Sequence, residues 1–264
     1  MGSVLVLDSI TTAGASAAGA VVVAASHGGL YAAALAARAG VRAVILSDAG
    51  IGCDGAGVAG VQALAVHGFA AAAADAATCR IGDGADMMRR GRISVVNPLA
   101  AALGVAPGDP VGGAAELLMH ARPGDAAGFT LAESRSSRCL ASGLDVVLID
   151  SVSLLRPEDA GRVVITGSHG ALLGGRPDST PPVAARLMVF NDAGFGPDRA
   201  GASRLPFLAE AGIPAATVAH HSARIGDAAS HLATGVLSAA NPPALALSLR
   251  PGCTLAAALD RLPA

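Results

Sequence analysis

The feature that most constrains the fold of this chain is an internal repeat. The segment VVVAASHGGL at residues 21–30 returns as VVITGSHGAL at 163–172, and ILSDAGIGCDGAG at 45–57 returns as VFNDAGFGPDRAG at 189–201. Matching residues lie 142 positions apart in the first pair of segments and 144 in the second. A constant offset with one two-residue insertion is what a tandem gene duplication leaves. The sequence therefore predicts two units of one fold, residues 1–121 and 144–264, joined by a connecting segment at 122–143.

The hydrophobic pattern within the first repeat predicts the fold class. Short β-branched or apolar runs indicate strands, and longer Ala-rich runs that end at glycine indicate helices. Strands are predicted at residues 4–8, 20–26, 42–50 and 69–78, and helices at 30–40 and 58–68. In the second repeat, 211–221 matches the fourth strand. Strands that alternate with helices form mostly parallel sheets with helices on both faces. We therefore expect an α/β fold of two tandem-duplicated units with mostly parallel sheets, related by a pseudo-twofold axis.

Composition excludes several classes of function. Hydrophobic residues make up 52% of the chain but aromatic residues only 2%, so the core must pack by close approach of small side chains. The net charge is -2 and no basic stripe carries interleaved aromatic residues, which argues against nucleic acid as a partner. The chain contains no lysine, and this excludes Schiff-base catalysis and a P-loop.

Cysteine usage and the N-terminal residues indicate a cytoplasmic location. The four cysteines are widely spaced and form no C-x-x-C pair, as expected for reduced thiols. The chain starts without a basic, apolar signal segment, and the uncharged stretch from Ser9 to Ala37 is interrupted by His27 and glycines. We therefore expect no membrane partner. The Ala-rich composition suggests an apolar surface and a homo-oligomer.

Both repeats carry the same polar residues, and all but the asparagines fall at the ends of predicted strands. In parallel sheets, ligands bind beyond the carboxyl ends of the strands, so these residues are the candidate site. They are Ser26, His27, Gly28, Asp48, Arg80, Asp83 and Asn97 in the first repeat, and Ser168, His169, Gly170, Asp192, Arg224, Asp227 and Asn241 in the second.

The residue types suggest acid–base chemistry. His169 and His27 are candidate general acids or bases, oriented by Asp192 and Asp48. Ser168 or its counterpart in the first repeat is a candidate nucleophile or hydrogen-bond donor.

The remaining repeated residues suggest recognition of an anion. Arg224 and Arg80 present planar forks for a carboxylate or phosphate. Gly28 and Gly170 would let a ligand approach the backbone. His221, which has no histidine counterpart in the first repeat, favours the second repeat as the catalytic half.

Each of these residues also has a structural interpretation. The histidines can hold a turn, the aspartates can cap helices, and the Arg–Asp pairs can fix their own loop. For Asn97 and Asn241, satisfying buried backbone groups is the stronger interpretation. Cys79 fits a plain buried thiol better than a nucleophile.

Three functions stay open on this sequence. The first is an enzyme, a hydrolase or lyase, that acts on a small anionic or amide-like metabolite. The cofactor stays open: a divalent metal held by His and Asp fits these residue types, but no H-x-x-x-H or H-E-x-x-H pattern supports it. The second is an NAD(P)-dependent oxidoreductase, suggested by the spacing of Gly50, Gly52 and Gly55 after a strand. The third is a non-catalytic protein whose two lobes close on a small ligand.

Overall fold

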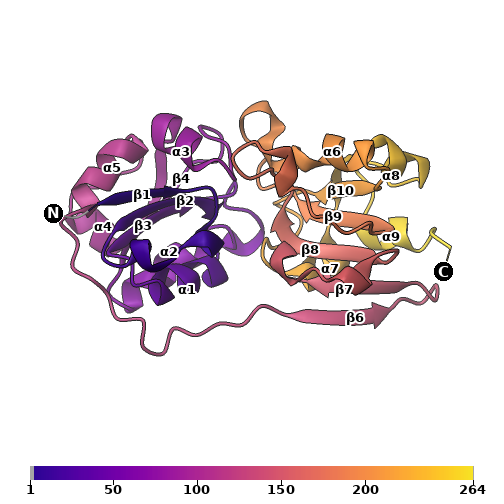
Figure 1. Cartoon of the computed structure of the whole chain (residues 1–264), viewed down its shortest axis with the longest axis horizontal. Coiled ribbons are helices and arrows are strands. Elements are labelled where there is room, and N and C mark those ends of the chain that lie inside the picture. Colours follow the sequence, from indigo (N-terminus) through magenta and orange to yellow (C-terminus); the bar gives the residue numbers. More distant parts are fainter. Residues whose placement is uncertain (1–2, 264) are drawn as a thin grey trace. The chain divides into compact units, whose positions relative to one another are not determined.

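The computed structural model describes residues 3–263 and divides into two compact units (Figure 1). Unit 1 holds the described residues up to Ile51, Gly55–Ala132 and Phe195–Asp198. Unit 2 holds Gly52–Asp54, Glu133–Gly194 and the described residues from Arg199 onward. Both units are α/β with mostly parallel sheets, so the predicted fold class is confirmed; the pseudo-twofold relation stays a prediction.

Unit 1 is built on a five-stranded sheet in which the strands lie side by side in sequence order. Strands β1 to β4 are parallel, and β5 runs antiparallel to β4. The strands are β1 (Val4–Leu7), β2 (Val21–His27), β3 (Ala43–Ser47), β4 (Ala70–Ala74) and β5 (Ile93–Val96). The five residues of β4 are all alanine and all buried. Their small side chains let helices pack closely against both faces of the sheet.

Helices cover both faces of this sheet. Val22 and Leu46 face the Ala-rich helices α1 and α2, whereas Val23 and Ile45 face α3 and α5, as the two-residue period of a strand requires. The helices of unit 1 are α1 (Leu30–Arg38), α2 (Ala59–Val66), α3 (Gly84–Arg90), α4 (Pro98–Ala102) and α5 (Val111–Leu118).

Unit 2 repeats this plan on a six-stranded sheet. Strands β7 to β10 are parallel, and an antiparallel strand flanks them at each edge. The strands are β6 (Arg135–Cys139), β7 (Asp145–Ile149), β8 (Val163–His169), β9 (Leu187–Asn191), β10 (Ala215–Val218) and β11 (Leu237–Ala240). The helices are α6 (Arg204–Glu210), α7 (Ala228–Thr234), α8 (Pro242–Ala246) and α9 (Leu255–Leu259).

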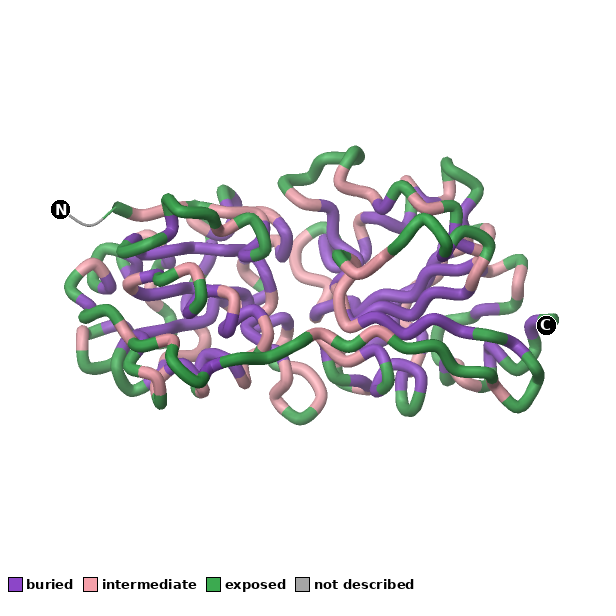
Figure 2. The backbone as a smooth tube through the Cα atoms, turned by 60° about the horizontal axis from the view of Figure 1, so that its bottom comes forward, coloured by how far each residue is buried: buried purple, intermediate pink, exposed green. Residues whose placement is uncertain are grey.

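The edge strand β6 lies within the segment that the sequence marked as a connector. Figure 2 shows its exposed backbone beside the buried strands of unit 2. The Arg135 side chain fastens it through two bonds, of 2.7 and 3.0 Å, to the carboxylate of fully buried Asp159.

One element of unit 1 has no counterpart in unit 2. The helix α1 follows β2, but residues 170–186, which follow β8, form only a short 3-10 helix at Pro177–Ser179. At the positions that match α1, this segment carries Gly174, Gly175 and Pro177. Glycine and proline are the poorest helix formers, so this stretch cannot form the helix.

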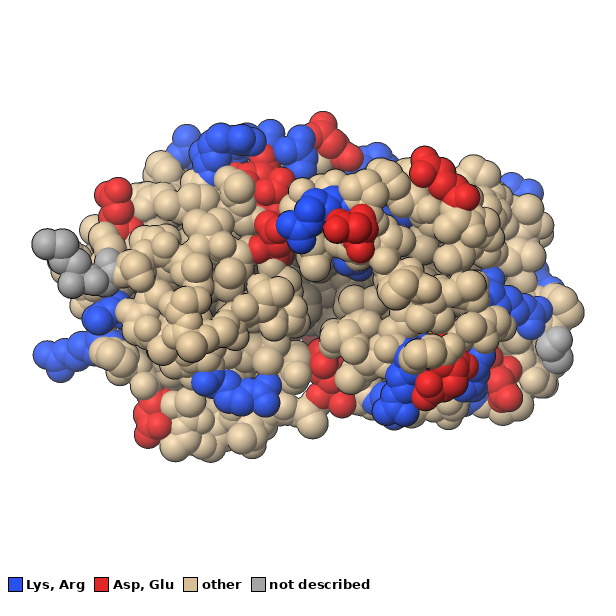
Figure 3. All heavy atoms as spheres, viewed as in Figure 1, with Lys and Arg blue, Asp and Glu red and all other residues tan. Residues whose placement is uncertain are grey.

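Across the described residues, no helix is both long enough and apolar enough to span a bilayer. On the face drawn in Figure 3, acidic and basic side chains lie interspersed among uncharged residues.

Candidate functional site

The repeated serines bind the segment that follows the first parallel strand of each unit. The Ser26 hydroxyl accepts a 3.0 Å hydrogen bond from the amide of Ile10, and the Ser168 hydroxyl accepts a 2.9 Å bond from the amide of Val152. Each of these amides belongs to the 3-10 helix that follows the first parallel strand of its unit. The hydroxyls therefore have the same structural partner in both units.

The repeated histidines hold the turn after their strands. In His27 and His169, the Nδ1 atom accepts a 3.2 Å hydrogen bond from the amide two residues later, that of Gly29 and Ala171. The neutral ring then carries its proton on Nε2. Burial lowers the pKa of His27 to about 4, so this imidazole is neutral near pH 7.

The glycines that follow these histidines stand where two backbone segments pack too closely for a side chain. A Cβ atom on Gly28 would lie 2.8 Å from the carbonyl oxygen of Gly57, and one on Gly170 would lie 2.7 Å from that of Gly201. Each glycine thus lets two backbone segments meet.

The repeated asparagines satisfy buried backbone groups. The Oδ1 atom of Asn97 accepts bonds of 3.2 and 3.0 Å from the amides of Ala71 and Ala100, and its Nδ2 donates to the carbonyls of Val61 and Phe69. Asn241 makes the four matching bonds in unit 2. In both asparagines, the side-chain oxygen and nitrogen are hydrogen-bonded to buried backbone groups.

The repeated arginine of unit 1 pairs with acidic side chains. Arg80 contacts the buried carboxylate of Asp86 at 3.0 Å and also pairs with Asp198. Two arginines of α3, Arg89 and Arg90, contact the same Asp86 carboxylate at 2.9 and 2.8 Å. Asp86 therefore gathers three guanidinium groups, and part of the Arg80 fork is already occupied.

The repeated arginine of unit 2 likewise pairs with acids. The Arg224 guanidinium contacts Asp227 at 3.2 Å and Asp54 at 2.9 Å. Asp83 and Asp227 cap the helices α3 and α7 by accepting a hydrogen bond from an amide of the first turn. These pairs occupy part of the guanidinium, although nearly half of the Arg224 side chain stays exposed.

The two repeated aspartates differ in what they contact. The Asp48 carboxylate accepts bonds from the amides of Gly50 and Ala76, at 2.8 and 2.9 Å, and from the Ser94 hydroxyl at 2.8 Å. Burial raises the pKa of Asp48 above its ordinary value. This aspartate holds the ends of β3 and β4 together.

Asp192 makes the matching backbone bonds and one further bond to a histidine. Its Oδ1 atom accepts from the amides of Gly194 and His220, both at 3.0 Å, and lies 2.9 Å from Nδ1 of the His220 imidazole. Burial pushes the pKa of Asp192 up, but the hydrogen bonds that its carboxylate accepts, chiefly from His220 and also from Ser238 and Gly194, together outweigh burial and place the pKa below the ordinary value. Asp192 is therefore a buried carboxylate that orients an imidazole.

The imidazole that contacts Asp192 belongs to His220, whereas the sequence favoured the next residue, His221. His221 is exposed, and its ring meets the His220 ring edge-on, with the centroids 5.3 Å apart. His220 stands where the first repeat has Ala76, and both residues donate their amide to the repeated aspartate. That shared backbone bond is the signal that could have identified His220, but only the folded chain reveals it.

Backbone amides of the glycine-rich loop after β3 donate hydrogen bonds to other atoms of the same loop. The amide of Gly50 donates to the Asp48 carboxylate, the amide of Ile51 to the Asp48 carbonyl, and the amide of Gly57 to the Ile51 carbonyl. A dinucleotide fingerprint needs such amides for its diphosphate. These three amides are already occupied in the folded chain.

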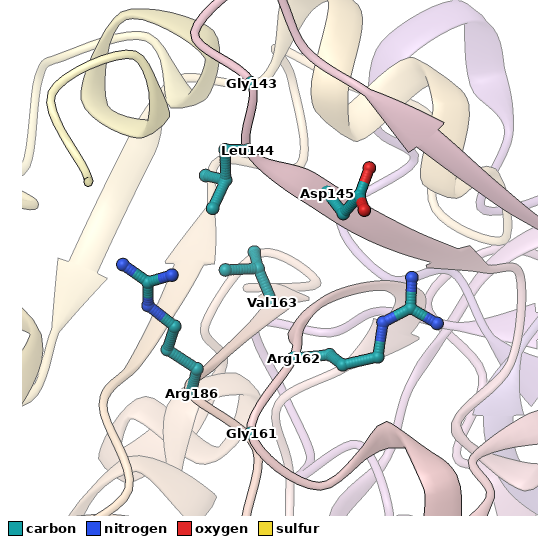
Figure 4. Close-up of a pocket in the computed structure, with 7 residues that line it drawn as sticks. All are labelled: Gly143, Leu144, Asp145, Gly161, Arg162, Val163 and Arg186. Carbon is teal, nitrogen blue, oxygen red and sulfur yellow. The ribbon is translucent and has the colours of Figure 1, made fainter. Parts of the chain in front are cut away.

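No cluster of three or more His, Cys, Asp or Glu side chains in residues 3–263 has the arrangement of a metal site. A cavity of about 290 Å³ in unit 2 lies at the amino ends of β7 and β8, away from the carboxyl ends that carry His220. Figure 4 shows Arg162 and Arg186 on either side of Val163 in this cavity.

Comparison with known proteins adds no family to this description: no family model, curated protein or solved structure matches the chain.

Proposed function

We propose that the chain is an enzyme that acts on a small anionic or amide-like metabolite, a hydrolase or related lyase, with His220 as its general acid and base. The observation that carries this proposal is the 2.9 Å bond between His220 Nδ1 and Asp192 Oδ1. The carboxylate is almost fully buried, whereas 27% of the His220 side chain is exposed. A buried carboxylate that fixes the tautomer of an accessible imidazole is a recurring arrangement for proton transfer.

The proposed role of each residue follows from this bond. With the proton on Nδ1 shared with Asp192, the Nε2 atom of His220 carries a lone pair. In a hydrolysis, Nε2 would take a proton from the attacking water and return it to the leaving group. Asp192 would hold the ring and stabilise the imidazolium that forms in between. Asp192 is thus a positioning residue in this scheme.

The proposal gives no chemical role to the repeated serines and histidines, because each has the same structural partner in both units. These residues are Ser26, Ser168, His27 and His169. A cytoplasmic location and self-association stay predictions of the sequence.

The test compares His220→Gln with His120→Gln across a panel of small esters, amides and carboxylates. His120 is an exposed histidine of unit 1 and serves as the matched control. For any substrate that the wild-type protein converts, we expect His220→Gln to lower kcat/KM by about 10²–10⁴-fold, the usual contribution of a general acid or base. Equal turnover by His220→Gln and wild type would contradict the proposal.

A second readout needs no substrate. Nitrogen-15 NMR of the imidazoles should find the neutral His220 ring protonated on Nδ1, because that atom faces the Asp192 carboxylate. A His220 ring protonated on Nε2 would remove the proposed base.

A further inference from the structure

Unit 2 contains a buried arginine that the proposed function does not use. Arg204 is the first residue of α6 and is only 2% exposed. Its Nη1 atom donates a 3.3 Å hydrogen bond to the His169 carbonyl, and its guanidinium carbon lies 5.8 Å from the centre of the Phe190 ring. The Nε atom is buried and has no hydrogen-bond partner among the described residues.

No acidic side chain in the described part of the chain compensates this charge. Burial lowers the pKa of Arg204 to about 10, and no neighbouring carboxylate acts to raise it again. At pH 7 the guanidinium is still cationic. A buried charge without a partner costs several kcal/mol, so proteins seldom keep one unless something binds it.

Comparison with unit 1 shows why unit 2 has room for the Arg204 side chain. Gly60 stands there, at the second residue of α2, and a Cβ atom on it would lie 2.3 Å from the Gly29 carbonyl oxygen and 2.6 Å from the Ala33 side chain of α1. Unit 2 lacks the counterpart of α1, so the same position can hold a long side chain.

The segment that replaces α1 supplies a second buried polar atom without a partner. The Thr180 hydroxyl lies in residues 170–186 and forms no hydrogen bond in the described structure. The same segment begins with Ala171 and Leu172 packed inside and carries two adjacent glycines with positive φ, Gly174 and Gly175. The backbone hydrogen bonds from the amides of Arg176, Ser179 and Thr180 each join residues three apart within the segment, and a segment held by such local bonds can move to admit a small ligand.

We propose that Arg204 binds the carboxylate of a small monoanionic ligand in unit 2, beside the start of the segment 170–186, where the Gly170 carbonyl accepts a hydrogen bond from the Arg204 amide. A planar guanidinium matches a carboxylate, and its Nε atom is a free donor for one of the two oxygens. A single buried cation neutralises a single negative charge, which favours a monocarboxylate over a phosphate dianion. The Phe190 ring beside the guanidinium is apolar and fully buried, so the rest of the ligand has to be small and apolar. This inference does not rest on the acid–base role of His220.

The experiment measures melting temperature in sodium acetate and sodium butyrate, against sodium chloride of equal ionic strength. A ligand that binds only the folded chain raises its melting temperature, so we expect a saturable rise of several degrees for the wild-type protein. The rise should be absent in Arg204→Met and retained in His220→Gln and in Arg186→Met, a matched change at another arginine of unit 2.

Inorganic phosphate distinguishes the class of anion and should give no rise beyond chloride. A wild-type protein that melts alike in carboxylate and chloride, or a rise that persists in Arg204→Met, would overturn the proposal. An equal rise in phosphate would overturn the assignment to monocarboxylates. If Arg204→Met does not fold, Arg204→Lys replaces it: the charge stays, the planar fork is lost, and the midpoint of the rise should shift to higher carboxylate concentration.

Discussion

The two units share a backbone plan but differ in what lies at the carboxyl ends of their strands. Unit 1 has Ala76 and Met87 at positions where unit 2 has His220 and His231. The serines, histidines and asparagines common to both units bond to backbone amides and carbonyls, whereas these two histidines of unit 2 bond to other side chains. The repeated serines, histidines and asparagines therefore build the fold, whereas the proposed base His220 stands at a position where the two repeats differ.

The two aspartates express this difference most directly. Burial raises the pKa of Asp48, whereas hydrogen bonds, chiefly those from His220, offset burial at Asp192 and lower its pKa. One carboxylate is a link between strands, and the other also orients an imidazole.

The greatest change in stability should come from the asparagines that both units share, and it tests whether the two are equivalent. Replacing Asn97 or Asn241 by alanine leaves two buried amides and two buried carbonyls without partners, so each should lower the free energy of unfolding by about 4 kcal/mol. Chemical denaturation of the two variants measures this. A loss confined to one variant would show that the asparagines are not equivalent.

The second prediction concerns the pH dependence of stability, to which His231 of unit 2 contributes and its counterpart in unit 1, Met87, does not. His231 is fully buried, accepts a 3.1 Å bond from Asn191, and has its pKa lowered by burial to about 4. The unfolded chain, with an ordinary pKa of 6.5, binds this proton more readily, so stability is full above about pH 7 and falls as the pH drops from 6.5 towards 4.

The variant His231→Met copies unit 1 at this position and should remove that loss. Between pH 7 and 4, the wild-type protein should lose about 3 kcal/mol more unfolding free energy than the variant. Denaturation curves at several pH values measure the difference, and His27 contributes equally to both proteins. Parallel losses would mean that His231 is not buried in its neutral form.

The smallest effect compares the two aspartates. Asp192→Asn removes the charge that receives the His220 bond and should cost about 2 kcal/mol. Asp48→Asn should cost less than about 1 kcal/mol, because burial already disfavours the charge at this position and an amide oxygen accepts the same backbone bonds. Thermal melts at pH 7 give both values, and equal losses would remove the distinction between the two carboxylates.

Much of the fold could be predicted from the sequence. The repeat predicts two similar units, and the predicted strands and helices of the first repeat lie within a few residues of β1 to β4, α1 and α2. The hydrophobic pattern does not predict β5, β6 or β11, because these strands are short or polar and lie at sheet edges.

The contacts within the candidate site could be predicted only in part from the sequence. The sequence placed Asp192 at a strand end, yet it favoured His169 and His221, and the imidazole that contacts Asp192 belongs to His220. Likewise, the partner of the Ser26 hydroxyl is an amide sixteen positions away in the chain, in Ile10.

The elements and their repetition follow from the sequence, because the period of a strand or helix is set by neighbouring residues. That His220 rather than His221 reaches Asp192, and that Arg204 is buried without a carboxylate, follows only from how the chain folds. Such contacts depend on distant segments that meet in the folded chain, such as the ends of β9 and β10.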